Sequence, residues 1–176
     1  MFYWDVQLFY LINHFRNTFL DYVLPIFSNS TFIDIFYILV SFLLCIKYSF
    51  KKYLVILIFM ILGFITVDFS CGRIFKPFFK RERPNVSVPN IYYYTNKEFK
   101  YLYKPLQKKS SYSFPSCHAV NSSFLSFFLS FFYLKSALIL YPFFVLVGWS
   151  RIYLGVHFPF DILGGWIFGF VSAFIF

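Results

Sequence analysis

The chain has 176 residues, of which 60% are hydrophobic, 27% are aromatic and only 13% are charged. A typical soluble domain carries about 25% charged residues, so a water-soluble globular protein is excluded and a membrane protein is predicted. The formal net charge is +9. Because the basic residues gather in one segment between apolar runs, they point to a lipid phosphate or an anionic membrane surface and away from nucleic acid.

Residues 1–30 mix aromatic and aliphatic side chains with polar ones, which is typical of an amphipathic helix lying in a membrane interface. Trp4 would then lie at headgroup depth. Residues 19–27 contain Asp21 and Pro25 and can form a short or broken additional span. The first ten residues lack the basic region of a cleavable signal peptide.

Apolar stretches follow at residues 31–46, 53–67, 116–134, 136–153 and 160–176. Each is close to the roughly 20 residues that a helix needs to cross a bilayer. We therefore predict an all-α integral membrane protein with a single domain over residues 1–176. It would be a bundle of five to six transmembrane helices with a basic interfacial loop at the active-site face.

The three cysteines do not indicate a disulfide framework, and their spacing does not fit a zinc site. Cys45 and Cys71 lie in or at the ends of apolar runs, where a thiol behaves as a small hydrophobic group. No metal site is predicted, because the acidic residues are scattered along the chain.

The first of three polar clusters opens the long basic segment at residues 73–113. Basic loops next to a membrane are common, and by itself this one is explained by the positive-inside rule. Its start reads KPFFKRERP over residues 76–84 and follows directly on an apolar stretch. Lys76 offers a mobile point charge and Arg83 a planar fork, and both suit phosphate oxygens.

The second cluster, at residues 115–118, opens the next apolar stretch with Pro115. If Pro115 occupies the first helical position, the amides after it lack helical partners and form an anion site. The Ser116 hydroxyl adds a donor, and His118 can protonate a leaving oxygen. A simple helix start with an interfacial histidine explains the same residues.

The third cluster contains Arg151, His157 and Asp161. A charge at the end of an apolar stretch is costly unless it serves a site. Pro159 is expected to open the last helix, which places Asp161 in its first turn, within reach of His157. The carboxylate can then fix the imidazole tautomer and leave the other nitrogen free to attack. A passive interfacial Arg–Asp pair is the alternative.

The order of the spans brings the three clusters to one membrane face, since each helix crosses and the next returns. The spacing Lys-x6-Arg-Pro, Pro-Ser-x-His, Ser-Arg-x5-His-x3-Asp, from Lys76 to Asp161, resembles the type 2 phosphatidic acid phosphatase family. The motifs cover about half of the chain. One departure is Cys117, where the family usually has Gly.

The resemblance implies that His157 is the nucleophile and forms a phosphohistidine, that Asp161 orients it, and that His118 protonates the leaving group. It implies no metal and no other cofactor. Two titrating histidines predict a bell-shaped pH dependence. The phosphate would be held by Lys76, Arg83, Ser116, Cys117 and Arg151.

The substrate is open to several lipid phosphates. The best match to the basic, tyrosine-rich loop is a bulky, multiply anionic headgroup, which favours lipid A 1-phosphate. Undecaprenyl diphosphate and phosphatidylglycerophosphate are alternatives, as are a lipid phosphotransferase and a non-catalytic lipid-phosphate-binding membrane protein. The loop residues that favour lipid A are Tyr92, Tyr93, Tyr94, Lys97, Lys100, Tyr101, Tyr103, Lys104, Lys108 and Lys109.

Sidedness is predicted from the short loops on the face opposite the clusters, which carry Lys47, Lys51, Lys52 and Lys135. The positive-inside rule then places the site outside the cytoplasm. The site-side loop is more basic, but several of its cations are needed for the substrate. We expect a bacterial inner-membrane protein with its site facing the periplasm, and no obligate protein partner. A transporter is disfavoured, because the charges lie at one interface and no repeat is visible.

Overall fold

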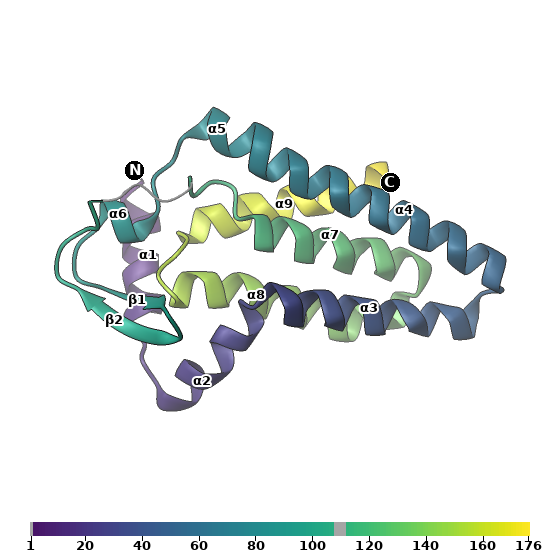
Figure 1. The fold of residues 1–176 in the computed structure, drawn as a ribbon, viewed down its shortest axis with the longest axis horizontal. Coiled ribbons are helices and arrows are strands. Elements are labelled where there is room, and N and C mark those ends of the chain that lie inside the picture. Colours follow the sequence, from purple (N-terminus) through teal and green to yellow (C-terminus); the bar gives the residue numbers. More distant parts are fainter. Residues whose placement is uncertain (1, 108–111) are drawn as a thin grey trace.

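The fold is a bundle of apolar helices with one end covered by a smaller cap, as Figure 1 shows for the computed structural model of residues 2–107 and 112–176. At residues 44 and 45 only the backbone is described. The bundle contains α3 (Ser30–Lys47), α4 (Phe50–Phe69), α7 (Cys117–Phe132), α8 (Ala137–Tyr153) and α9 (Pro159–Ile175). A short 3-10 turn, η2 (Leu134–Ser136), joins α7 to α8.

The cap lies at the end of the bundle where the chain begins (Figure 1). Its elements are α1 (Tyr3–His14), α2 (Thr18–Phe27), α6 (Pro84–Ser87), β1 (Ile91–Thr95) and β2 (Glu98–Leu102). The chain reaches this cap from α4 through a π-helical turn, η1 (Ser70–Phe75), and α5 (Lys76–Phe79).

Among the residues that the structure describes, two helical segments are long and apolar enough to cross a membrane, namely Phe50–Ser87 and Leu134–Tyr153. The pair Thr18–Phe27 and Ser30–Leu43, bent by 66°, adds a third if it counts as one span. The helices α7 and α9 are shorter apolar helices. Each predicted apolar stretch is helical over most of its length, while the number of spans, five to six, stays a prediction.

The expectation of an all-α chain is incomplete, because β1 and β2 form an antiparallel hairpin within the basic segment. The local sequence explains it. The strands are rich in tyrosine, which favours a pleated surface. Asn96 and Lys97 at the turn both have positive φ, 52° and 64°, as a two-residue hairpin turn of the right twist requires.

The amino-terminal helix packs into the cap instead of lying only along a membrane interface. Trp4 is exposed, but Phe9 on the other side of α1 is fully buried against Phe158. Buried Asn13 ties three segments together: its amide donates to the carbonyl oxygens of Tyr92 (2.8 Å) and Tyr153 (3.0 Å), and its Oδ1 accepts from the Tyr92 amide.

A disulfide joins Cys71 in η1 to Cys117 at the start of α7, with the two Cα atoms 5.7 Å apart. The interpretation of the cysteines as separate thiols is therefore wrong for this pair. Their 46-residue separation gave no sequence signal, since only the packing of α4 beside α7 brings them together. The side chain of Cys45 lies outside the described residues.

Two glycines allow α9 to approach α7 closely. A Cβ at Gly165 would lie 2.8 Å from the Ala119 Cβ and 2.9 Å from the Ser116 carbonyl oxygen. A Cβ at Gly169 would overlap the side chain of Ser123 and the backbone of α7. In lipid, helices associate through such close approach of small residues, and this contact fixes the start of α9 relative to the start of α7.

We predict that Gly169→Ala destabilises the bundle by about 1–3 kcal/mol, the usual cost of overpacking. The matched control is Gly72→Ala, because a Cβ at Gly72 meets no described atom within 4 Å. Thermal unfolding in detergent should show a lower midpoint for the first variant and an unchanged or higher one for the second. Equal midpoints would mean that the contact between α7 and α9 does not need glycine at this position.

Candidate active site

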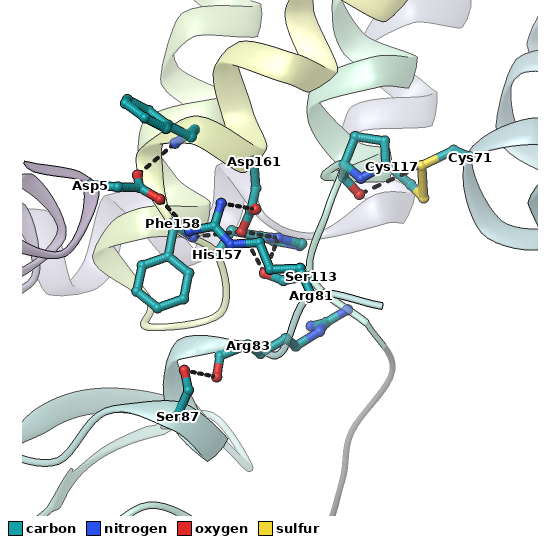
Figure 2. Close-up of polar contacts among 12 residues, drawn as sticks. Asp5, Cys71, Arg81, Arg83, Ser87, Ser113, Cys117, His157, Phe158 and Asp161 are labelled. Carbon is teal, nitrogen blue, oxygen red and sulfur yellow. Dashed lines mark hydrogen bonds and ion pairs between the residues drawn. A yellow bond between two sulfur atoms is a disulfide. The ribbon is translucent and has the colours of Figure 1, made fainter. Parts of the chain in front are cut away.

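Three segments that are distant in the sequence meet where the bundle joins the cap (Figure 2). The amide of Ser113, before α7, donates to the carbonyl oxygen of Arg81, between α5 and α6, at 2.7 Å. The amide of Ser116 donates to the carbonyl oxygen of Asp161 in α9 at 3.1 Å. The predicted convergence of the three polar clusters at one end of the bundle is confirmed.

His157 lies in the turn between α8 and α9 and is only 1% exposed. The amides of Val156 and His157 donate to the Arg151 carbonyl oxygen at 3.2 and 3.3 Å, which closes the turn. Gly155 allows the chain to turn from α8 toward α9, since its φ of +75° is a conformation that other residues rarely adopt. A Cβ at this position would also overlap the Tyr92 carbonyl group of β1. The imidazole is thus carried by a turn that packs against the hairpin.

Asp161 occupies the first turn of α9, which begins at Pro159 as predicted. Its Oδ2 accepts from the Phe158 amide at 2.8 Å, as acidic groups at a helix N-terminus often do. The hydroxyl of Ser113 donates to the same oxygen. Nδ1 of His157 lies 3.4 Å from Oδ2, so the predicted pairing of imidazole and carboxylate is present.

The electrostatic surroundings of His157 favour the neutral imidazole. Burial, followed by the positive charges of Arg83, Arg151 and Lys76, holds the pKa of the imidazole well below its ordinary value of 6.5. A neutral ring keeps a lone pair at neutral pH. Because Nδ1 faces the Asp161 carboxylate, Nε2 is the nitrogen that remains available for attack.

The three predicted phosphate-binding cations lie together. Lys76 begins α5, Arg83 precedes α6 and Arg151 lies in the last turn of α8, and the charges of Arg83 and Arg151 both act on Lys76. Arg151 donates through Nη1 to the side chain and carbonyl oxygen of Ser28. Within the described part of the chain, Arg151 Nε and the Ser116 hydroxyl are buried without a hydrogen-bond partner. Buried donors normally have partners, and phosphate oxygens would satisfy both.

His118 lies in the first turn of α7 and lines a cavity of about 220 Å³. The backbone of Ser28, to which Arg151 donates, is also a hydrogen-bond partner of His118, so His118 lies beside Arg151. The same cavity is lined by Asp34 of α3, Asp68 of α4 and Asn121 of α7. The Asn121 amide donates to Asp68 Oδ1 at 2.7 Å. The expected proton donor therefore faces a cavity in which two carboxylates and an amide lie among apolar residues such as Ile33, Phe64 and Leu125.

One detail of the predicted phosphate cradle is wrong. Pro115 does not occupy the first helical position: α7 begins at Cys117, Ser116 is its N-cap, and the Ser116 amide already has a partner. The amides of the first turn of α7 still have no partner within the helix. The Cys117 sulfur is bonded to Cys71, and the predicted role of Cys117 in binding phosphate falls to its backbone amide and stays a prediction.

Three residues at the site were not predicted. Arg81 donates through Nη1 to Asp161 Oδ1 at 2.7 Å and through Nη2 to Asp5 of α1, and Ser113 bonds the other Asp161 oxygen. Asp5 had a recognisable signal, since a lone carboxylate among apolar residues is expensive without a partner. Arg81 was hidden among neighbouring basic residues, and the sequence around Ser113 carries no signal.

Comparisons with known proteins agree with the motifs. The family described as "PAP2 superfamily" matches residues 52–176. A protein of Bacteroides thetaiotaomicron named lipid A 4'-phosphatase is 27% identical over 185 residues, which cover 96% of this chain and 76% of the relative. Phosphatidylglycerophosphatase B of Bacillus subtilis is 36% identical over 88 residues, 42% of this chain and 41% of the relative.

Two crystal structures share the fold. A transmembrane PAP2-type phosphatidylglycerolphosphate phosphatase from Bacillus subtilis gives a TM-score of 0.69 at 25% identity, covering 97% of this chain and 81% of that one. LpxE of Aquifex aeolicus gives a TM-score of 0.67 at 25% identity, covering 99% of this chain and 94% of that one. Because the family match extends from α4 to the carboxyl terminus and includes all three motifs, the chain belongs to the PAP2 superfamily and is an integral-membrane enzyme of the lipid phosphatase class.

Proposed function

We propose that this chain hydrolyses the phosphate ester of a membrane lipid through a phosphohistidine on His157. The main support is the buried imidazole, whose Nδ1 lies 3.4 Å from the Asp161 carboxylate. The cations that hold its pKa down, Arg83, Arg151 and Lys76, are also the groups suited to phosphate oxygens. One set of charges thus keeps the nucleophile neutral and attracts the anion it attacks.

In the first step, Nε2 of His157 bonds to phosphorus while the bond from phosphorus to the lipid oxygen breaks. His118 donates a proton to that oxygen, so the lipid leaves as an alcohol. In the second step, a water oxygen attacks phosphorus, His118 takes the water proton, and the N–P bond breaks to release inorganic phosphate. Lys76, Arg83 and Arg151 stabilise the charge on the phosphoryl oxygens.

A glycolipid phosphate of the lipid A class is the substrate that we propose. The cavity beside His118 offers the carboxylates of Asp34 and Asp68 and the amide of Asn121, which suit the hydroxyl groups of a sugar. A polyprenyl diphosphate would instead leave as a phosphate, an anion facing those two carboxylates. Phosphatidylglycerophosphate, whose leaving group carries glycerol hydroxyls, is the second candidate.

The position of the phosphate on lipid A is a finer question. The relative named lipid A 4'-phosphatase aligns with 96% of this chain, which favours the 4' position over the 1 position predicted from the sequence. The hairpin supports a bulky anionic headgroup, because Lys97, Lys100 and Lys104 are exposed on or beside it. Lys108 and Lys109, from which the same preference was predicted, lie outside the described residues.

The disulfide supports a site that faces away from the cytoplasm. Stable disulfides form in oxidising compartments such as the bacterial periplasm, and the bond between Cys71 and Cys117 lies beside the site, with Cys71 Sγ 3.8 Å from the Pro115 carbonyl oxygen. At the other end of the bundle, Lys47, Lys51 and Lys52 are exposed, as expected of a basic cytoplasmic face. We propose an inner-membrane enzyme with a periplasmic active site.

The purified protein should release phosphate from lipid A in the presence of EDTA, and His157→Ala should lower the rate by more than about 10³-fold. His14→Ala is the matched control, because His14 contacts the carbonyl oxygen of Asn90 in the cap. Lipid A 1-phosphate, lipid A 4'-phosphate, phosphatidylglycerophosphate and undecaprenyl diphosphate are compared as substrates, and the products are identified by mass spectrometry.

Phosphate release that needs a divalent metal, or that survives in His157→Ala, contradicts the mechanism. Transfer to an added alcohol would identify a phosphotransferase, and binding without turnover a lipid-phosphate-binding protein.

Acidification should inactivate the enzyme only at a pH below the ordinary pKa of histidine, because the lowered pKa of His157 preserves the neutral ring as the pH falls. Lys76→Gln removes one cation that opposes protonation, so the pKa of His157 rises and the acid limb of kcat/KM moves to higher pH. The loss of a charged phosphate contact also lowers kcat/KM by roughly 10- to 100-fold. The exposed Lys80, changed to Gln, is the control, and an acid limb that coincides in the two variants would refute this electrostatic origin of the lowered pKa.

The disulfide can be tested by counting free thiols, which react with a maleimide-linked polymer after denaturation of the protein. Without reductant one cysteine, Cys45, should react, and after reduction all three should. In spheroplasts, an impermeant reductant followed by an impermeant maleimide should modify Cys71 and Cys117 but leave Cys45, near the opposite end of α3, unmodified. Modification that requires lysis would place the site in the cytoplasm instead.

A further inference from the structure

A buried series of charged groups leads from the amino-terminal helix to the nucleophile (Figure 2). Asp5 of α1 pairs with Nη2 of Arg81, and Nη1 of the same guanidinium donates to Asp161 Oδ1 at 2.7 Å. The second Asp161 oxygen faces Nδ1 of His157 at 3.4 Å. Both carboxylates are completely buried, so one guanidinium is placed between two buried anions.

Arg81 is held firmly in this position. Its guanidinium lies over the Phe158 ring, 4.6 Å from the centroid. Its carbonyl oxygen accepts from the amide of Ser113, and the Ser113 hydroxyl bonds the same Asp161 oxygen that faces the imidazole. Arg81 therefore acts on the carboxylate directly through its side chain and indirectly through its backbone.

Asp5 in turn connects this group to α9. Its Oδ1 accepts from the Phe160 amide at 2.8 Å, one residue before Asp161, while its Oδ2 receives Arg81. A buried carboxylate is stable only when it is paired and hydrogen-bonded. Both of its oxygens have a donor, so α1 is attached to the start of the helix that carries Asp161.

The arrangement has a chemical consequence for the imidazole. If the Arg81 guanidinium were bound to Asp161 alone, its positive charge would neutralise much of the negative charge of that carboxylate. Asp161 would then be a weaker acceptor for the proton on Nδ1 of His157. With Asp5 as a second partner, the positive charge is shared, and Asp161 keeps more of its negative charge for His157. The planar fork of the guanidinium also fixes the rotation of the Asp161 carboxylate.

We propose that Arg81 and Asp5 are positioning residues for the nucleophile: Asp5 holds Arg81, and Arg81 holds the Asp161 carboxylate so that Oδ2 keeps the proton of His157 on Nδ1 and leaves Nε2 free. This inference rests on the proposed function, in which Nε2 attacks phosphorus. The amino-terminal helix thereby takes part in catalysis, although the family match begins only at residue 52.

The test measures the tautomer of His157 by ¹⁵N NMR in detergent, assigned with His→Gln variants of the three histidines. Asp5→Asn should increase the Nε2–H tautomer and lower kcat while KM changes less than about twofold. Arg81→Gln, which removes the donor to Asp161 Oδ1, should change both quantities in the same direction. Adding it to Asp5→Asn should have little further effect, because Asp5 acts through Arg81. Lys76, Arg83 and Arg151, the other cations that face His157, are unchanged in these variants.

Glu98→Gln, which removes an exposed carboxylate from β2, is the control for a lost negative charge. If Asp5→Asn does not fold, Arg81→Lys gives the same readout, because it keeps the charge but cannot grip both carboxylates in one plane. The inference is overturned if the tautomer matches that of the control, or if the effects of Asp5→Asn and Arg81→Gln simply add in the double variant. If the wild type hydrolyses no lipid, the proposed function fails, and the tautomer still decides whether Asp5 and Arg81 position His157.

Discussion

Each buried charge needs a partner, and the part of this structure around the active site, where the bundle joins the cap, depends on that constraint. A carboxylate can orient an imidazole only while it is ionised, and an ionised group away from water needs several donors. Asp161 obtains them from the Phe158 amide, the Ser113 hydroxyl and the Arg81 guanidinium. These donors come from three segments of the chain, so the carboxylate has all of its partners only when those segments meet.

The same requirement explains why a small cap is attached to a bundle that already has its own apolar core. The bundle core is built from α3, α4, α7, α8 and α9 and does not include α1. A second cluster around Phe9, Ile91 and Phe158 packs α1 and the hairpin over the catalytic turn. Burial is the largest cause of the lowered pKa of His157, and Phe158 of this cluster is the next residue in the chain. Apolar packing beside the turn thus supports a chemical property of the site.

Much of this could be predicted from the sequence, because the relevant signals are local. The helices follow from apolar runs, and the site residues follow from charged groups that are costly at the ends of those runs, such as Arg151 and Asp161. The signals that failed are long-range. Cys71 and Cys117 meet through helix packing, and Asp5 meets Arg81 across the fold. The hairpin was missed although it has a local signal, the Asn96–Lys97 turn, because the basic charge of the segment drew the interpretation toward a solvated loop.

The disulfide turns residues 72–116 into a covalently closed ring, since it joins Cys71 to Cys117. That ring contains two of the phosphate-binding cations and the whole hairpin. The entropic cost of closing a loop grows only slowly with its length. The ring can therefore gain or lose residues on its headgroup-facing side while η1 stays attached to the start of α7. A protease that cuts inside the ring would leave two fragments that remain one molecule until the bond is reduced.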